Sequence, residues 1–147
     1  MSAAIIDASV GVKWFVPEIH AAEARCWCNG PDELHVPAFF FDLEIASILW
    51  KKVRRAEITR ADADQILAQL PGLAVQRHPE GPLLPAAFDL AHRSDRTVYD
   101  CLYLALAVQL GGRMVTADQR LYNSLVGTPW ASFVCWVGDR LPAKPPG

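Results

Sequence analysis

The sequence lacks the ligand spacings of a zinc site. Its four cysteines and four histidines include no Cys-x-x-Cys pair and no His-x-x-x-His pair, and the nearest approach is Cys26-Trp-Cys28. Thiolates and imidazoles at those spacings are what structural and catalytic zinc sites use. We therefore expect no zinc site, and we expect the cysteines to be the reduced thiols of a cytoplasmic protein.

Excess positive charge and membrane-spanning runs are also missing. Fourteen Lys and Arg residues face sixteen Asp and Glu residues, a net charge of −2. A polyanionic ligand would therefore need local basic residues or a bound metal ion to attract it. The apolar run 101–112 is too short to cross a bilayer. The amino terminus has no basic segment and Asp7 interrupts its first apolar run, so neither a signal peptide nor a membrane association is expected.

Length and composition are those of one globular domain. The chain has 147 residues, of which 52% are apolar and 20% are charged. That length is enough to bury a sizeable core, and that composition is not typical of disorder. We expect a single domain over residues 1–140, followed by a Pro-rich tail over residues 141–147.

Short apolar runs alternate with longer helical patterns along the chain. This alternation predicts an α/β fold in which helices cover both faces of a central parallel sheet. Strands are expected at 3–6, 33–36, 73–76, 113–116 and 133–137. Helices are expected at 10–16, 18–28, 39–55, 59–70, 82–93, 97–110 and 119–125.

Four acidic residues stand alone in apolar or small-residue surroundings: Asp7, Glu44, Asp100 and Asp118. Asp7 follows the first expected strand and Asp118 closely follows the fourth, and open parallel sheets bind ligands beyond such strand ends. Glu44 and Asp100 lie near helix starts that could reach the same rim. Converging carboxylates would repel by roughly 4 kcal/mol per close pair at an effective dielectric of about 20. A divalent cation such as Mg²⁺ is the usual remedy, so all four are candidate catalytic and metal-binding residues.

Helix capping is the competing interpretation for three of these acids. Asp7 and Asp118 each precede an expected helix, and Asp100 stands three residues after Thr97, as in a capping box. Capping does not explain Glu44, which lies within an apolar helix and needs a cation, a basic partner or solvent. A capping carboxylate also keeps lone pairs free, so the two roles are compatible.

Candidate substrate contacts lie beside the acids. Helical spacing places Glu44, Ser47 and Lys51 on one stripe, where Lys51 could meet a phosphate. Ser9 and Thr116 offer hydroxyl groups next to the acids. We therefore expect Ser9, Lys51 and Thr116 to bind substrate, the alternative being local turn bonds and a solvated lysine.

The order and spacing of four segments resemble a known family. The segments are DASV at 7–10, Pro37 followed by EIASIL at 44–49, TVYD at 97–100 leading into a long apolar helix, and VTADQRL at 115–121. Together they resemble a PIN domain and, more narrowly, a VapC-type toxin ribonuclease of a type II toxin–antitoxin system. The resemblance runs from residue 4 to about residue 137.

The resemblance implies a three-layer α/β/α sandwich with a central parallel sheet. It implies a Mg²⁺-dependent endoribonuclease, with Mn²⁺ as a substitute, whose acidic quartet is Asp7, Glu44, Asp100 and Asp118. It also implies an RNA substrate and a cognate antitoxin, and the apolar excess adds the expectation of a homodimer. One departure is Ser47, where the family commonly has asparagine.

Two other functions stay open from the residues alone. A receiver-like phosphoacceptor also gathers acids around magnesium, but it needs an aspartate after the third strand and a lysine after the last one, and the expected strands provide neither. A non-catalytic interaction protein is the second alternative. Its aromatic segments at 14–15, 39–41 and 50 would mostly lie in the core, with some forming a groove for a partner helix.

Overall fold

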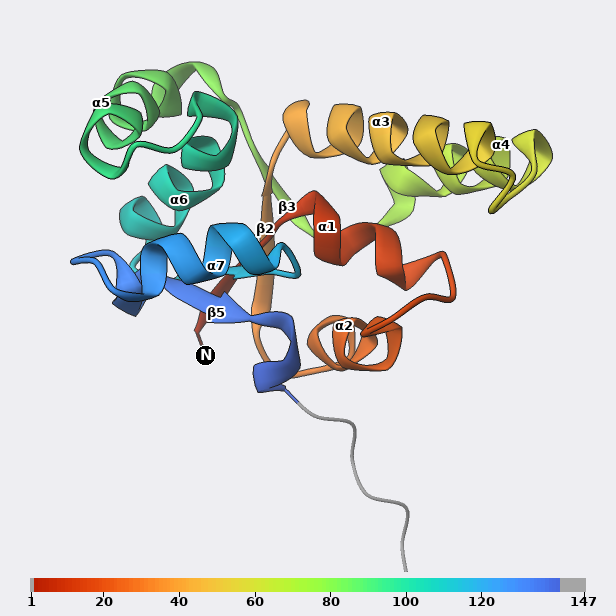
Figure 1. Cartoon of the computed structure of the whole chain (residues 1–147), viewed down its shortest axis with the longest axis horizontal. Helices are drawn as coiled ribbons and strands as arrows, with labels where there is room; N and C mark the ends of the chain where they lie inside the picture. The colour runs from red at the N-terminus through yellow and green to blue at the C-terminus, as the bar shows by residue number, and fades with distance from the viewer. Residues whose placement is uncertain (1, 141–147) are drawn as a thin grey trace, which may run out of the picture.

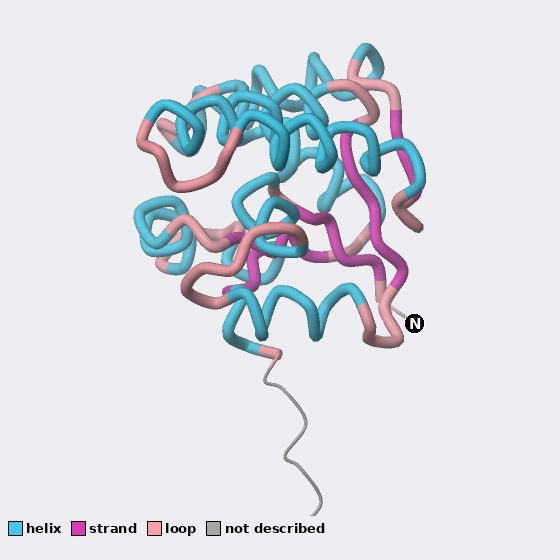
Figure 2. Tube along the Cα trace, turned by 90° about the vertical axis from the view of Figure 1, so that its right-hand side faces the viewer, coloured by secondary structure: helices cyan, strands magenta, loops and turns pink. Residues whose placement is uncertain are grey.

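The computed structural model describes residues 2–140 and contains one five-stranded parallel sheet of order β3-β2-β1-β4-β5. Ile5 of β1 pairs with His35 of β2 on one side and with Met114 of β4 on the other. Figure 2 shows the strands passing through the interior, with helices above and below them. The strands are β1 (Ala3–Ile6), β2 (Glu33–Pro37), β3 (Gln76–His78), β4 (Arg113–Thr116) and β5 (Val134–Trp136).

Helices cover both faces of the sheet, so the predicted α/β/α sandwich is confirmed. In Figure 1, α5 and α6 lie to one side of the strands and α1 to α4 lie to the other. The α-helices are α1 (Ala8–Gly11), α2 (Ala21–Cys28), α3 (Phe40–Arg54), α4 (Arg60–Gln69), α5 (Leu84–Ser94), α6 (Val98–Leu110) and α7 (Gln119–Val126). Short 3-10 turns are η1 (Val12–Trp14), η2 (Leu70–Gly72), η3 (Gly81–Leu83), η4 (Ala131–Phe133) and η5 (Val137–Asp139).

Local sequence signals fix the ends of the main helices. Thr59 and Asp62 form a reciprocal capping box at the start of α4. Thr97 accepts the Asp100 backbone N–H at the start of α6, which ends where Gly111 takes a left-handed φ of 62°. A side chain at Gly112 would collide with the Ala3 carbonyl oxygen, at 2.3 Å, so this turn can pass close to β1 only without a Cβ.

The core lies between the sheet and helix α6. Ile5 and Ile6 of β1 and Val115 of β4 are fully buried. Every residue of α6 from 101 to 107 is buried as well, because this helix is enclosed by the sheet and by α5. The rigid layer formed by β1, β4 and α6 carries three of the four candidate acids at its ends.

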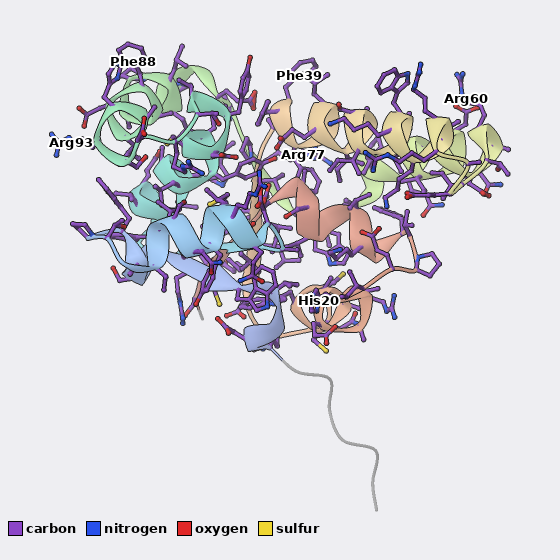
Figure 3. All side chains as sticks on the ribbon, viewed as in Figure 1. His20, Phe39, Arg60, Arg77, Phe88 and Arg93 are labelled. Carbon is purple, nitrogen blue, oxygen red and sulfur yellow. The ribbon has the colours of Figure 1, made fainter. Side chains whose placement is uncertain are left out.

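Two expected elements differ from the structure. The third strand lies at Gln76–His78 and not at 73–76, because β3 is a polar edge strand, whereas Leu73 and Val75 pack against the core from a loop. Arg77, labelled in Figure 3, binds the carbonyl oxygens of Ala38 and Leu70 and so fixes β3 in place. The second helix begins only at Ala21, since His20 takes a left-handed φ of 65°.

The aromatic segments lie mostly in or against the core, as expected, and two of their rings are exposed. Phe41 is fully buried, and Trp14, Phe15 and Phe40 are partly buried. Phe39 and Trp50 are 68% and 58% exposed, and the Phe39 ring stands on the outside of α3 in Figure 3.

Residues 2–140 contain no helix that is long and apolar enough to cross a membrane. The expected Pro-rich tail at 141–147 lies outside the described residues. The division into a domain at 1–140 and a tail stays a prediction.

Candidate functional site

The strand order reverses between β1 and β4, and two of the candidate acids lie at this switch point. Asp7 directly follows β1, and Asp118 follows β4 by two residues. The Asp7 backbone N–H donates to the Val115 carbonyl oxygen at 3.1 Å, which holds the two strand ends together. Side chains beyond the carboxyl ends of such strands border the crevice where doubly wound sheets bind ligands.

Asp7 is held by two hydroxyl groups. Its Oδ2 accepts hydrogen bonds from Ser9 Oγ at 2.8 Å and from Thr116 Oγ1 at 2.9 Å. Ser9 Oγ in turn accepts the Ala117 N–H, and Thr116 Oγ1 accepts the Asp118 N–H, each at 3.0 Å. The β4–α7 turn is thereby tied to Asp7. Asp7 begins α1 but makes no side-chain cap bond, so capping does not account for it.

Glu44 has a partner that the sequence analysis did not identify. The Tyr103 hydroxyl donates to Glu44 Oε1 at 2.6 Å and joins α6 to α3. Burial, together with the charges of Asp7 and Glu44, raises the pKa of Tyr103 well above its ordinary value of 10, so its hydroxyl stays protonated and donates. A sequence signal existed, because Asp100 and Tyr103 lie three residues apart and share one helix face.

Asp100 and Asp118 differ in how far capping explains them. The Asp100 N–H donates to Thr97 Oγ1 at 3.1 Å, but its carboxylate returns no bond to complete a capping box. Asp118 is a true cap, since its Oδ1 accepts the backbone N–H groups of Arg120 and Leu121 at 3.1 and 3.2 Å. The interpretation of Asp118 as a helix cap is confirmed. Asp118 also lies at the switch point, and the two roles are compatible.

Burial and neighbouring negative charge raise the pKa of three of the four acids. Burial raises the pKa of Asp7 from 3.8 to about 6; the bonds from Ser9 and Thr116 oppose that rise, and the charges of Asp100 and Asp118 add to it. Burial raises the pKa of Glu44 to about 7, and the charges of Asp7 and Asp100 contribute to the rise. Burial also raises the pKa of Asp100, with help from Asp118.

The donor set fits a hard divalent cation. All four side chains offer only oxygen, and no ion pair within residues 2–140 involves any of them. Oxygen-only sites suit Mg²⁺ and Mn²⁺. Over the same residues, no three His, Cys, Asp or Glu side chains already stand at the spacing for one ion. A bound cation would have to draw the carboxylates closer together.

The predicted substrate contacts lie in different surroundings. Thr116 is fully buried and gives its proton to Asp7, which favours a role in positioning that acid. Ser9 is partly buried and also donates to Asp7. Lys51 lines a pocket of about 290 Å³ together with Glu44 and Ser47, as their helical spacing indicates. Contact between any of these residues and substrate stays a prediction.

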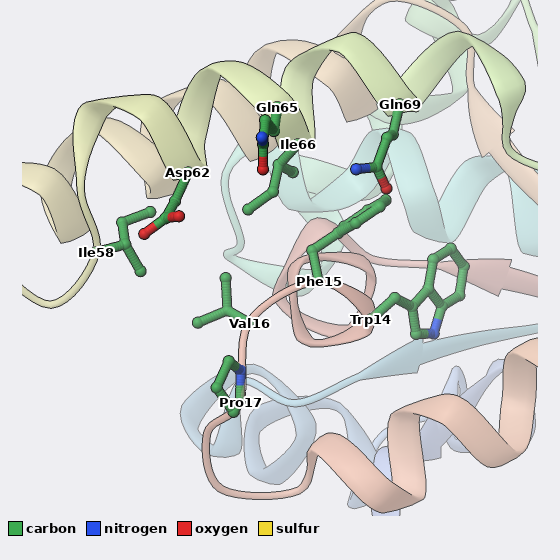
Figure 4. A pocket seen from close by; sticks show the side chains of 9 residues that line it. All are labelled: Trp14, Phe15, Val16, Pro17, Ile58, Asp62, Gln65, Ile66 and Gln69. Carbon is green, nitrogen blue, oxygen red and sulfur yellow. The ribbon is translucent and has the colours of Figure 1, made fainter.

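A larger hollow of about 420 Å³ lies elsewhere, between η1 and α4. Figure 4 shows Trp14 and Phe15 facing the amides of Gln65 and Gln69 across it. Its one carboxylate, Asp62, is engaged in the α4 capping box. This hollow gathers no cluster of titratable groups, so the chemistry points to the carboxylates at the switch point.

A doubly wound parallel sheet with carboxylates of raised pKa near its switch point defines a class of α/β domain whose crevice suits a divalent cation. The family is shown by comparison with known proteins. The PIN domain model matches residues 4–124, and the chain belongs to the PIN domain family.

Individual relatives indicate which members of the PIN domain family the chain resembles. Ribonuclease VapC3 of Pyrobaculum aerophilum is 34% identical over 122 residues, which cover 80% of this chain and 90% of that protein. Ribonuclease VapC12 of Mycobacterium tuberculosis is 32% identical over 120 residues, 82% of this chain and 90% of the relative. The resemblance to PIN domains and VapC ribonucleases is therefore confirmed.

A solved structure supports the fold. The crystal structure of PAE2754 from Pyrobaculum aerophilum superimposes with a TM-score of 0.66 at 21% identity, covering 94% of this chain and 85% of that one. At this identity the similarity concerns the fold alone.

Proposed function

We propose that this chain is a divalent-metal-dependent endoribonuclease, with Mg²⁺ as its cofactor and Mn²⁺ as a substitute. The observation that carries the proposal is that Asp7, Glu44 and Asp100 have pKa values raised by burial and by the charges of other acids of the set, while no salt bridge within residues 2–140 involves Asp7, Glu44, Asp100 or Asp118. The ribonuclease names of the relatives support RNA as the substrate.

The four acids would hold the cation, and the neighbouring residues would orient them. Ser9 and Thr116 fix Asp7, and Tyr103 fixes one oxygen of Glu44. Asp118 commits its Oδ1 to the start of α7 and keeps Oδ2 for the crevice. Such supporting bonds set the direction of ligand lone pairs and tune their basicity.

A divalent cation bound by these carboxylates would lower the pKa of a coordinated water and offset charge on the phosphodiester. The raised pKa values of Glu44 and Asp7, about 7 and about 6, mean that near pH 7, without a cation, Glu44 is protonated in a large fraction of molecules and Asp7 in a small one. Cation binding would therefore displace protons from the crevice.

We further propose that the protein is the toxin of a toxin–antitoxin pair, that it acts on RNA in the cytoplasm, and that it forms a homodimer. The VapC names of the relatives support the antitoxin partner. Exposed apolar side chains, among them Phe39 and Trp50, offer surfaces for such protein contacts.

The receiver-like alternative is disfavoured by the sheet. Receiver domains have the strand order 2-1-3-4-5, whereas this sheet has the order β3-β2-β1-β4-β5. Within the described residues, no aspartate directly follows β3 and no lysine follows β5. A purely binding function would leave the buried, mutually repelling acids without a purpose.

The test compares RNA cleavage by the wild type, Asp100→Asn and the surface control Asp89→Asn, with Mg²⁺, with Mn²⁺ and with a chelator. Asp89 lies on α5, pairs with Arg93 and is well exposed. We expect cleavage by the wild type and by Asp89→Asn that the chelator abolishes, and loss of cleavage in Asp100→Asn. Equal rates for Asp100→Asn and the wild type would overturn the proposal.

A further inference from the structure

A pocket of about 290 Å³ opens directly beside the carboxylates. We call it the Tyr99 pocket; the residues that matter here are Phe40, Glu44, Ser47, Lys51 and Tyr99. Glu44 belongs both to this pocket and to the acidic crevice, so any group in the pocket lies next to the site of chemistry. Its volume is near the lower bound of roughly 300 Å³ for small-ligand sites, which suits one nucleotide.

Two stacked aromatic rings form one wall of the pocket. Tyr99 is 64% exposed and lies nearly parallel to Phe40, with ring centroids 5.4 Å apart and an interplanar angle of 15°. Phe40 packs on Tyr103 at 5.8 Å, and Tyr103 donates to Glu44. Phe40 and Tyr103 therefore connect the exposed Tyr99 ring to Glu44 and fix its position relative to that acid.

The rest of the lining belongs to α3, where the polar side chains of Glu44, Ser47 and Lys51 alternate with Leu43 and Ile48. Lys51 is exposed and makes no ion pair within residues 2–140, and Ser47 presents an exposed hydroxyl one helical turn from Glu44. A flat aromatic surface next to an unpaired cation is the combination that single-stranded nucleic acids use, because the base stacks while the phosphate meets the positive charge. An apolar peptide side chain would make no favourable interaction with the charge of Lys51.

We propose that the Tyr99 pocket holds one unpaired nucleobase of the RNA, stacked on Tyr99, while Lys51 contacts a phosphate next to the one that is cleaved. This inference rests on the proposed ribonuclease function and adds a base-binding subsite to it. A base within a duplex cannot expose its face to Tyr99, so the pocket selects single-stranded or looped segments for cleavage.

The experiment measures kcat and KM with a single-stranded oligoribonucleotide and with a series in which one abasic position moves along the chain. The variants are Tyr99→Ala, Tyr99→Trp and the control Phe88→Ala, whose exposed ring lies on α5 in Figure 3. Tyr99→Ala should raise KM about tenfold with little change in kcat, because stacking energy is lost before the chemical step. Tyr99→Trp should retain the wild-type KM, and Phe88→Ala should not change it.

The abasic series identifies the base that the pocket holds. One abasic position near the cleaved bond should raise the KM of the wild type about tenfold, and the same position should cost Tyr99→Ala nothing further, since the two changes remove one contact. Melting temperatures of the variants serve as the folding control.

An unchanged KM for Tyr99→Ala, with wild-type cleavage intact, would overturn the pocket proposal, leave the ribonuclease proposal standing and assign the exposed ring to a protein partner. A second measurement is independent of cleavage: fluorescence anisotropy of the same oligoribonucleotide with Asp100→Asn and with Asp100→Asn carrying Tyr99→Ala. Equal affinities of the two would also overturn it.

Discussion

Two clusters of charged side chains share helix α3, and they are built in opposite ways. The first joins Lys13 of η1 and Lys52 of α3 through Glu18. The second joins Asp7, at the start of α1, to Glu44 of α3 and to the other two acids. The first cluster pairs charges of opposite sign in salt bridges, whereas no salt bridge within residues 2–140 involves the four acids, although the charge of Arg96 lowers the pKa of Asp100.

The mixed cluster satisfies its own charges. Lys13 is only 8% exposed, yet its Nζ lies 2.9 Å from Glu18 Oε1, and Lys52 pairs with the other oxygen of Glu18. Burial acts to raise the pKa of Glu18, but the bonds from Lys52 and Lys13 outweigh it and hold that pKa below its ordinary value. Such a cluster joins the η1 segment to α3 and needs no further ligand.

The acidic cluster does not satisfy its charges. Burial raises the pKa of Asp7, Glu44 and Asp100, and the acids raise one another's pKa values further. The comparison shows that this fold can supply a buried lysine to a buried acid where stability requires it. No salt bridge within residues 2–140 gives the acidic cluster such a partner, which supports our proposal that a cation binds there.

Matched substitutions in the two clusters should separate activity from stability. Glu44→Gln removes a proposed cation ligand and should lower kcat/KM for RNA by at least about 100-fold, because even indirect supports of a metal site are worth 10 to 100-fold. Its melting temperature should not fall, because the raised pKa of Glu44 means that the ionised carboxylate itself costs stability. Steady-state cleavage assays measure the activity, and thermal unfolding of the same preparations measures the stability. Wild-type activity of Glu44→Gln would contradict a functional role for the acidic cluster.

Glu18→Gln should do the reverse. It leaves Lys13 and Lys52 partly buried without their shared partner, and we expect a loss of about 2 kcal/mol in the free energy of unfolding, reduced from the fully buried case by solvent screening. Because the Glu18 pKa is lowered, its contribution is present above about pH 4.5, its ordinary pKa, and disappears as the pH falls further. Urea unfolding at pH 7.5 and pH 4 measures this, and an undiminished kcat is the control.

Tyr103→Phe tests the link between the core and the acidic cluster. Removing the hydroxyl that donates to Glu44 should lower kcat/KM about tenfold. Because that bond lowers the pKa of Glu44, its loss should shift the acidic limb of the pH–rate profile upward. A packing role alone would leave the profile unmoved, so an unshifted limb would contradict a positioning role for Tyr103.

Asp7→Asn should stabilise the protein in the absence of a divalent cation. The Asp7 pKa is raised from 3.8 to about 6, so the ionised carboxylate costs stability that increases as the pH rises from about 4 through 6. At pH 8 the variant should be more stable by about 1 to 2 kcal/mol, and near pH 4 the difference should vanish. Chemical unfolding in chelator at both pH values measures it; a less stable variant at pH 8 would show that the acidic cluster carries no strain.

Much of this fold was predictable because its signals are local. Gly111-Gly112 marks the end of α6, Thr59 caps α4, and the apolar run at 113–116 matches β4. The third strand was misplaced because its position depends on an edge pairing and on Arg77, neither of which leaves an apolar pattern. The exposed rings of Phe39 and Trp50 could not be separated from the buried Phe41 without the packing of α3.

The sequence singled out the four candidate acids but not the side chains that contact them. Asp7, Glu44, Asp100 and Asp118 stood out because a lone carboxylate in an apolar segment is costly. Tyr103 did not stand out, because a tyrosine in an apolar helix is usual in a core and its partner lies on another helix. Stacking of Tyr99 on Phe40 likewise joins two helices whose contact only the fold determines.

The claim that the four carboxylates share one divalent cation is tested most directly by calorimetric titration of Mn²⁺ into the wild type and into Asp7→Asn, Glu44→Gln, Asp100→Asn and Asp118→Asn. The wild type should bind Mn²⁺ with proton release near pH 7, and affinity should fall as the pH drops through the raised pKa values of about 7 and about 6. Each variant should bind more weakly. Mn²⁺ affinities that are the same in the wild type and in all four variants would contradict the account.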